Sequence, residues 1–163
     1  YLDPLTKLHN RKAMSKHLDA WMSEDPDKKI AAIVINIDKF SQVKDEFGPL
    51  IGDVLLSKIA TKINSYVGES GFPIRSAGDE FLILLPEIQS SIAGEIAEKI
   101  RQGVEKLRFI SSKSGMRLPQ MTISLAVNDF IVSENINTVV NNTRNILDEV
   151  QNHSYNQVSF VPR

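Results

Sequence analysis

Short apolar runs at the spacing of β-strands are the feature that most limits the fold of this chain. The run IAAIVINI, residues 30–37, is short and rich in β-branched residues, which is typical of a strand buried on both faces. Two more strands are predicted at 72–76 and 81–85, and the turn between them contains Gly78. A glycine-containing turn between two apolar runs predicts an antiparallel hairpin.

Apolar residues at helical spacing lie between these strands. Helix-period stripes predict four helices, one of which starts at Gly48–Pro49. The stripe residues are Met14, Leu18 and Trp21, then Ile51, Leu55, Ile59 and Ile63, then Ile92, Ile96, Ile100 and Val104, and finally Val139, Ile146, Leu147 and Val150. The stretch SSKSGMRLP, residues 111–119, predicts a polar loop, and strands are predicted at 121–127 and at the C-terminal QVSFV.

The predicted order is one helix, then β-α-β-β-α-β, then a further helix and strand. This order resembles a ferredoxin-like core with extensions, so we expect an α+β fold with a five-stranded, mostly antiparallel sheet flanked by helices. A helical crossover makes the first strand parallel to the second, and the hairpin reverses the third. The end of the first strand and the hairpin turn therefore meet at one edge of the sheet.

Two adjacent carboxylates, Asp79 and Glu80, lie in that hairpin turn. Like charges this close repel each other unless a cation or a hydrogen-bond donor is near. The topology brings Asn36 and Asp38 towards them, and oxygen ligands of this kind suit Mg²⁺. Two alternatives remain open: the acids are ordinary turn residues, and Asp38 is the N-cap of the segment KFSQVKDEF.

Composition predicts one globular domain over residues 1–163, with 42% apolar and 24% charged residues. A net charge of −1 gives no broad positive field, so we expect no nucleic acid partner. The apolar runs are too short to cross a bilayer, and the chain has no cysteine. We therefore expect a cytoplasmic domain without membrane contact. Because the chain begins at Tyr1 rather than methionine, we expect a fragment of a larger protein, whose other parts could include a membrane anchor.

Four motifs resemble those of the GGDEF family in order and spacing: DPLTKLHNR (3–11), NIDKFSQVKDEFGPLIGDVLL (36–56), RSAGDEF (75–81) and TISLAV (122–127). The chain is similar to a diguanylate cyclase domain from end to end, with Ala77 replacing the first glycine of the signature. The resemblance implies a nucleotidyl-cyclase-like fold in a bacterial cytoplasmic module. It also implies condensation of two GTP into cyclic di-GMP, with each half of a homodimer holding one GTP and Mg²⁺.

The resemblance assigns roles at the acidic edge. Asp79 is implied to be a catalytic residue and a metal ligand, and Glu80 is the second acid of the signature, also assigned as catalytic. The carbonyl of Ile37 matches the backbone metal ligand of the family. Asn36 and Asp38 complete the expected metal set.

The resemblance also assigns residues that bind the nucleotide. Asp53 matches the carboxylate that accepts hydrogen bonds from guanine, and Gly78 leaves room for a ligand at the turn. Arg75, Phe40 and Lys44 lie at further substrate-binding positions. Asp53 could instead only stabilise a helix dipole, and Lys44 could be a solvated helix residue or form a salt bridge to the acid pair.

Several positions depart from the family pattern in ways that weaken catalysis. Asn36 replaces a metal-binding aspartate, and Lys44 replaces an asparagine that reads guanine. Ser41 and Gln151 replace lysines that neutralise the triphosphate, and Tyr155 replaces an arginine. Each lost donor in a phosphoryl-transfer site costs roughly 3 kcal/mol of transition-state stabilisation, so we expect catalysis to be impaired.

The inhibitory product site of the family, an Arg-x-x-Asp pattern before the signature, corresponds to Gly68 and Gly71. Neither glycine supplies a charge, so we expect no feedback by cyclic di-GMP at that site.

Three functions are consistent with these residues. The first is a degenerate GGDEF module that binds GTP weakly or dimerises and regulates an adjoining domain, such as a sensor or a cyclic di-GMP phosphodiesterase of the EAL type. The second is an active diguanylate cyclase, supported by the intact GDEF and Asp53. The third is a structural module without a ligand. The first is the function we favour from the sequence.

Overall fold

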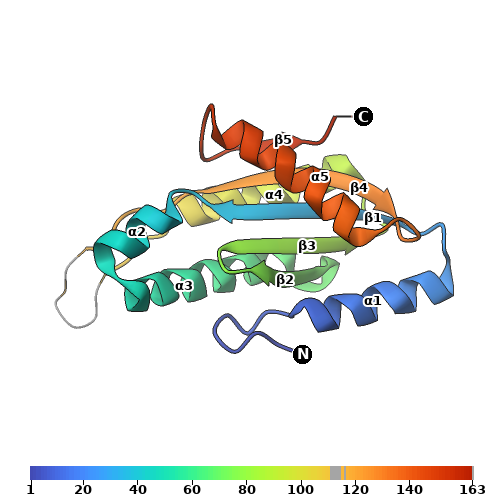
Figure 1. Ribbon diagram of the computed structural model, residues 1–163, viewed down its shortest axis with the longest axis horizontal. Helices are drawn as coiled ribbons and strands as arrows, with labels where there is room; N and C mark the ends of the chain where they lie inside the picture. The colour runs from blue at the N-terminus through green and yellow to red at the C-terminus, as the bar shows by residue number, and fades with distance from the viewer. Residues whose placement is uncertain (111–114, 116, 163) are drawn as a thin grey trace.

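A five-stranded sheet forms the centre of the computed structural model, which describes residues 1–110, 115 and 117–162. The strand order is β2-β3-β1-β4-β5 (Figure 1). The strands are β1 (Lys29–Ile37), β2 (Phe72–Ala77), β3 (Glu80–Pro86), β4 (Ile123–Ile131) and β5 (Val158–Phe160). All neighbouring pairs are antiparallel except β4 and β5. The predicted α+β fold with a mostly antiparallel sheet is confirmed.

Helices cover both faces of this sheet (Figure 1). They are α1 (Arg11–Glu24), α2 (Phe40–Phe47), α3 (Pro49–Val67), α4 (Ser90–Glu105) and α5 (Ile136–Gln151), with a short 3₁₀ turn at Gly68–Ser70. Residues of α3 and α4 share one apolar cluster with the sheet, and residues of α1 and α5 share the other. The molecule therefore has three layers, with the sheet buried in the middle.

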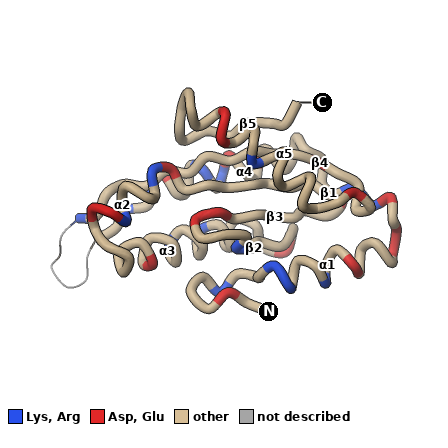
Figure 2. Tube along the Cα trace, in the orientation of Figure 1, with Lys and Arg blue, Asp and Glu red and all other residues tan. Residues whose placement is uncertain are grey.

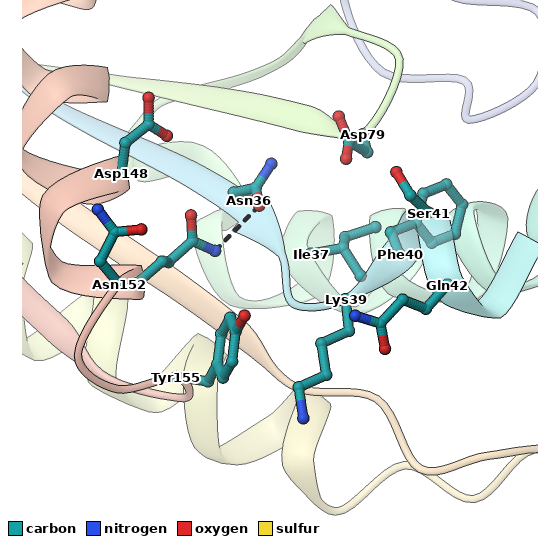
Figure 3. Close-up of a pocket in the computed structure, with 11 residues that line it drawn as sticks. Asn36, Ile37, Lys39, Phe40, Ser41, Gln42, Asp79, Asp148, Asn152 and Tyr155 are labelled. Atoms are coloured by element: carbon teal, nitrogen blue, oxygen red, sulfur yellow. Dashed lines mark hydrogen bonds between the residues drawn. The ribbon is translucent and has the colours of Figure 1, made fainter.

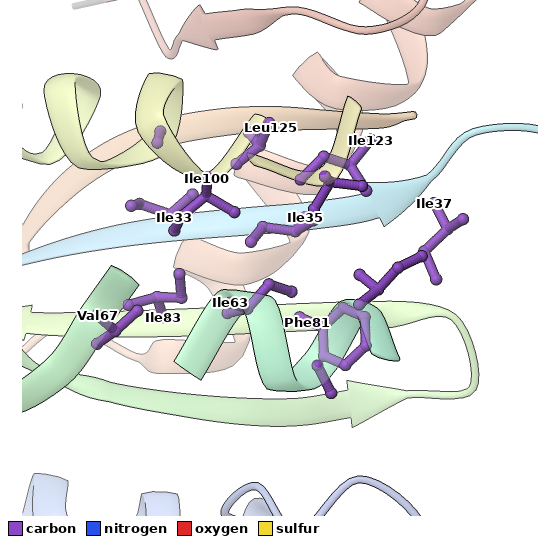
Figure 4. Close-up of a cluster of buried hydrophobic side chains, with 14 of the residues drawn as sticks. Ile33, Ile35, Ile37, Ile63, Val67, Phe81, Ile83, Ile100, Ile123 and Leu125 are labelled. Carbon is purple, nitrogen blue, oxygen red and sulfur yellow. The ribbon is translucent and has the colours of Figure 1, made fainter. Parts of the chain in front are cut away.

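Alternation along β1 decides which face each of its side chains meets. Ile33, Ile35 and Ile37 pack among the side chains of α3 and α4, whereas Val34 packs on the side of α1 and α5 (Figure 4). Each of these residues is almost fully buried, and burying such a side chain contributes about 1.5–3 kcal/mol. Because side chains alternate along a strand, Asn36 must point towards α5.

The boundaries of several elements differ from the sequence prediction by a few residues. β4 begins at Ile123 and continues to Ile131, beyond the predicted 121–127, because Asn128 and Asp129 still pair with β1. The helix start at Pro49 is confirmed. Gly48, with φ of 91°, separates α2 from α3. Much of the predicted polar loop 111–119 lies outside the described residues.

Charged residues of both signs are interspersed along the fold (Figure 2), in keeping with the net charge of −1. No helix within the described residues is both long and apolar enough to cross a membrane.

Candidate functional site

A pocket of about 370 Å³ lies where the end of β1, the β2–β3 turn, the start of α2 and the end of α5 meet (Figure 3). It is lined by Asn36, Ile37, Lys39, Phe40, Ser41, Gln42, Asp79, Asp148, Gln151, Asn152 and Tyr155. The topology therefore brings the first strand and the hairpin turn together, as the sequence predicts. The pocket contains several residues assigned to metal and substrate, but not all of them.

Asp79 lies beside the end of β1. Its carbonyl accepts a hydrogen bond from the N–H of Ile37 at 3.4 Å, which ties the turn to the strand. Its half-buried carboxylate has no hydrogen-bond or ion-pair partner within residues 1–110, 115 and 117–162. Asp79 is therefore free to bind a cation at the pocket.

Gln151 connects α5 to the end of β1. Its side-chain amide donates to Asn36 Oδ1 at 3.0 Å, the dashed line in Figure 3. It also donates to Asp38 Oδ1 at 3.0 Å. Gln151 and Asn36 both depart from the family pattern, in which a lysine and an aspartate are expected. The two replacements are therefore joined by one hydrogen bond.

Asp38 is buried, with 4% of its surface exposed, and its carboxylate is saturated by the protein. Oδ2 accepts from Thr122 Oγ1 at 2.7 Å and from the N–H of Asn156 at 2.9 Å. Oδ1 accepts from Ser124 Oγ at 2.7 Å and from Gln151. Asp38, predicted to be a metal ligand, thus accepts from four donors and does not line the pocket.

The prediction that Asp38 caps α2 is wrong. The N-cap is Lys39, which has a left-handed backbone with φ of 56°, and no side chain caps this helix. The first N–H groups of a helix have no intrahelical partner, and here they belong to pocket residues Phe40, Ser41 and Gln42. Unshielded N–H groups and the helix dipole favour an anion at this end of the pocket.

Glu80 lies on the face of β3 that meets α5 and does not line the pocket. Only 6% of its surface is exposed. Arg144 binds both carboxylate oxygens, with Nε–Oε1 of 2.5 Å and Nη2–Oε2 of 2.9 Å, and Ser76 Oγ donates to Oε2 at 2.7 Å. The carboxylate to which the resemblance assigns a catalytic role is therefore bound and neutralised by the protein itself.

Burial is the largest influence on the pKa of Glu80 and would raise it. The hydrogen bonds from Arg144 and Ser76 and the charge of Arg144 together outweigh burial, so the pKa of Glu80 lies below its ordinary range. The hydrogen bond to Glu80 raises the pKa of Arg144 in turn. Glu80 is thus charged at neutral pH and paired.

Arg75 supports the turn rather than the pocket. Its Nη2 donates to the carbonyl of Gly78 at 2.8 Å, and its Nη1 contacts the carboxylate of Asp3 at 3.2 Å. The guanidinium, predicted to bind substrate, therefore binds Asp3 and the carbonyl of Gly78 in this structure. Gly78 itself is exposed, with open space where a Cβ would stand.

Lys44 and Asp53 lie outside the pocket, on neighbouring helices. The Lys44 stem packs over Gly52, where a Cβ would come within 2.8 Å of Cγ, and its ammonium lies 5.1 Å from the ring centre of Phe40. In the described part of the chain Lys44 makes no ion pair with the acid pair of the turn. Asp53 is exposed and lies beyond the first turn of α3, so a stabilising contact with the helix dipole does not fit.

Sequence reasoning named Gln151 of α5 but missed Arg144 and Asp148. Arg144, Asp148 and Gln151 are spaced four and three residues apart, so they share one face of the helix. Two of them line the pocket and the third binds Glu80. Polar residues at helical spacing next to an apolar stripe were the signal that could have indicated this face.

The residues that fit Mg²⁺ are fewer than predicted. Asp79 offers a free carboxylate, and Ile37 lines the pocket beside it. The oxygen of Asn36 is shared with Gln151. Within the described residues, no group of three or more His, Cys, Asp or Glu side chains could hold a metal, so water and substrate oxygens would have to complete the coordination of Mg²⁺.

The positions of the family's inhibitory site are shaped by backbone geometry. Gly68 has φ of 53°, a conformation that favours glycine. A Cβ at Gly71 would lie 2.4 Å from the carbonyl oxygen of Leu84. A side chain at position 71 therefore requires β3 to move. This steric limit explains why the position is a glycine.

Comparison with known proteins agrees with this geometry. The family model "Diguanylate cyclase, GGDEF domain" matches residues 1–157. The chain is 28% identical over 156 residues to the diguanylate cyclase VdcA of Vibrio cholerae, covering 96% of this chain and 45% of VdcA. It is 36% identical over 130 residues to the response regulator PleD of Caulobacter vibrioides, covering 77% of this chain and 28% of PleD. The chain therefore spans less than half of each relative.

Solved structures show the same fold. The GGDEF domain of DgcB from Caulobacter crescentus, determined in complex with c-di-GMP, has a TM-score of 0.90 at 25% identity, covering 99% of this chain and 93% of that one. The FimX GGDEF domain from Pseudomonas aeruginosa has a TM-score of 0.85 at 20% identity, covering 97% and 98%, and shares the fold. With the motifs, the pocket and the family model in agreement, this chain belongs to the GGDEF domain family of diguanylate cyclases.

Proposed function

We propose that this chain is a degenerate GGDEF domain that binds GTP weakly with Mg²⁺, makes little or no cyclic di-GMP, and regulates an adjoining domain. The observation that carries the proposal is the state of the predicted acids. Among the predicted acids Asp38, Asp79 and Glu80, Asp79 lines the pocket without a partner in the described part of the chain, whereas Glu80 is bound by Arg144 and Asp38 by four donors of the protein.

The missing metal carboxylate and the missing lysines slow phosphoryl transfer more than they weaken nucleotide binding. Phosphoryl transfer depends on positioned charge, and each group removed from the transition state costs roughly 3 kcal/mol. Asn36 carries no charge, and Ser41 and Gln151 provide no ammonium group for the phosphates. A total of several kcal/mol corresponds to a rate loss of many orders of magnitude.

The residues that remain still support weak nucleotide binding. The uncapped start of α2 offers N–H groups to a phosphate, and Asp79 and Ile37 would hold Mg²⁺, which supplies the neutralising charge. Asp53 is exposed and free to accept the paired N–H donors of guanine. The triphosphate of GTP would therefore be held at the pocket, and its guanine by Asp53.

The regulatory role rests on domain context. VdcA and PleD are each more than twice as long as the segment matched here. We therefore propose that this single domain, residues 1–163 of the sequence given, is part of a longer cytoplasmic signalling protein with a sensor or EAL domain beside it. Homodimerisation is part of this proposal, because the resemblance to diguanylate cyclases implies a homodimer with one GTP in each half.

The test is chromatographic measurement of cyclic di-GMP after incubation with GTP and Mg²⁺. The chain is fused to a dimeric coiled coil, so that failure to dimerise cannot explain a negative result, and an active family member is fused in the same way as a control. We expect no product above the enzyme-free blank. Turnover similar to that of the active control would show that the chain is a working cyclase and contradict the proposal.

A further inference from the structure

Arg144 reaches from α5 to the second acid of the signature, 64 residues away in the chain. Its guanidinium binds Glu80 through two parallel hydrogen bonds, and the remaining donor to this carboxylate is Ser76. Bidentate arginine–carboxylate pairs are among the stronger polar contacts in proteins. None of the three residues lines the pocket.

Glu80 lies next to the proposed metal site, although its side chain does not line the pocket. It is next to Asp79 in the chain and opposite Asn36 in the sheet, because its Cα is paired with that of Asn36 in the β1–β3 register. Glu80 does not reach a cation at Asp79, because Arg144 of α5 binds its carboxylate.

We propose that Arg144 is a positioning residue that keeps Glu80 from coordinating a metal, so that Asp79, and not Glu80, is the carboxylate of the turn that binds a divalent cation. The guanidinium and the Ser76 hydroxyl occupy both oxygens of Glu80. The arginine also supplies the positive charge that neutralises Glu80, which a bound metal ion would otherwise supply. The affinity of the site for a metal ion is therefore lower than it would be with Glu80 available.

The neighbouring charge on α5 fits this arrangement. Asp148, one helical turn after Arg144, lines the pocket and adds to the negative charge that raises the pKa of Arg144. Arg144 therefore lies between two acids, one buried and one exposed. Loss of its charge leaves Glu80 available to a cation from solvent, whereas Asp148 is already exposed.

The experiment is titration of the nucleotide-free chain with Mn²⁺, followed by electron paramagnetic resonance of the free ion. Arg144→Gln removes the charge but keeps an amide donor near Glu80. We expect it to bind Mn²⁺ about tenfold more tightly, or more, which is the size of effect that partners of metal ligands have on affinity. Adding Glu80→Gln to this variant should abolish the gain. Arg144→Lys, a point charge without the fork, should give a smaller gain.

The matched control is Arg101→Gln, because Arg101 is also paired with a glutamate but lies on α4. Its Mn²⁺ affinity should equal that of the unmodified chain. Glu80→Gln alone should also leave Mn²⁺ affinity unchanged, because Glu80 is not a ligand while Arg144 holds it. A folded Arg144→Gln protein without tighter binding would overturn the proposal. If that variant does not fold, weaker Mn²⁺ binding by Glu80→Gln alone would overturn it.

This inference rests on the proposed role of Asp79 as a metal ligand but not on nucleotide binding. The measurement contains no GTP, so a chain that gains Mn²⁺ affinity as expected and yet binds no GTP would contradict only the proposed function. A chain that binds GTP with Mg²⁺ but shows no Mn²⁺ gain in Arg144→Gln would contradict only this inference.

Discussion

Arg75 donates two hydrogen bonds from its guanidinium to the carbonyl of Gly78, at 2.8 and 3.3 Å, across the turn that carries Asp79. The same guanidinium is paired with Asp3, whose carboxylate also accepts from Thr6. The N-terminal segment is thereby connected to the turn at the pocket, and the position of Asp79 depends on contacts made outside the pocket.

Removing this support should affect both stability and ligand binding. Arg75→Ala should lower the free energy of unfolding by about 1–3 kcal/mol, the range for hydrogen bonds to charged groups, and should weaken Mg²⁺-dependent GTP binding because the turn is less fixed. Urea unfolding and fluorescent-nucleotide titration measure the two effects. Arg108→Ala, at an exposed position, should change the free energy of unfolding by less than about 0.5 kcal/mol. Equal effects from the two variants would contradict this role.

Asp38 should behave as a structural residue rather than a metal ligand. Asp38→Ala leaves four donors without their acceptor, so we expect the free energy of unfolding to fall by about 2–5 kcal/mol. Asp45→Ala, which removes an exposed carboxylate of α2, is the control and should cost less than about 0.5 kcal/mol. If Asp38→Ala kept full stability and lost only metal binding, the metal assignment from the sequence would be restored.

The pair between Glu80 and Arg144 predicts a contribution to acid sensitivity. Because the folded-state pKa of Glu80 lies below its ordinary value of 4.5, its stabilising contribution is complete above that value and is lost as pH falls through the folded pKa. Asp3 and Glu98 have lowered pKa values as well, so the full chain also loses stability in acid for other reasons. Glu80 must therefore be isolated by a variant.

Glu80→Gln should show a smaller drop in the free energy of unfolding between about pH 6 and about pH 3 than the unmodified chain. Urea unfolding at a series of pH values gives the comparison. Glu95→Gln, at an exposed position of α4, should keep the original pH profile. A Glu80→Gln profile parallel to that of the unmodified chain would show that the pair does not titrate as the structure implies.

The fold was largely predictable because its signals are local. β-branched runs, helical stripes and a glycine turn each report on a few neighbouring residues, and the crossover rule then orders the strands. The placement of Asn36 next to the turn followed from this order alone. Boundaries were less certain, as β4 shows, since Asn128 and Asp129 are polar residues held in a strand by pairing with β1.

The site was less predictable because its side chains are bound by residues distant in sequence. Nothing near Asp38 in the chain indicates that Asn156 and Ser124 occupy its oxygens. Glu80 likewise meets Arg144 only once α5 packs on the sheet. Motif matching named candidate positions, whereas the structure shows that the carboxylates of Asp38 and Glu80 are bound by other residues of the protein.

Product binding provides a separate test. Calorimetric titration with cyclic di-GMP should show no tight saturable heat, because Gly68 and Gly71 provide no charge and Gly71 cannot carry a side chain without moving β3. An active family member with the inhibitory motif is the positive control. A submicromolar site that disappeared after substitution of Gly68 would contradict this prediction.

The central claim is that nucleotide binding depends on Mg²⁺ and on the one free acid of the turn, Asp79. The most direct measurement is titration of fluorescent GTP against the unmodified chain and Asp79→Ala, each with and without Mg²⁺, with Asp53→Ala included to test guanine recognition. We expect weak binding that requires Mg²⁺, is lost in Asp79→Ala, and no longer prefers GTP over ATP in Asp53→Ala. GTP binding that persisted without Mg²⁺ and without the Asp79 carboxylate would contradict the account and favour a structural module.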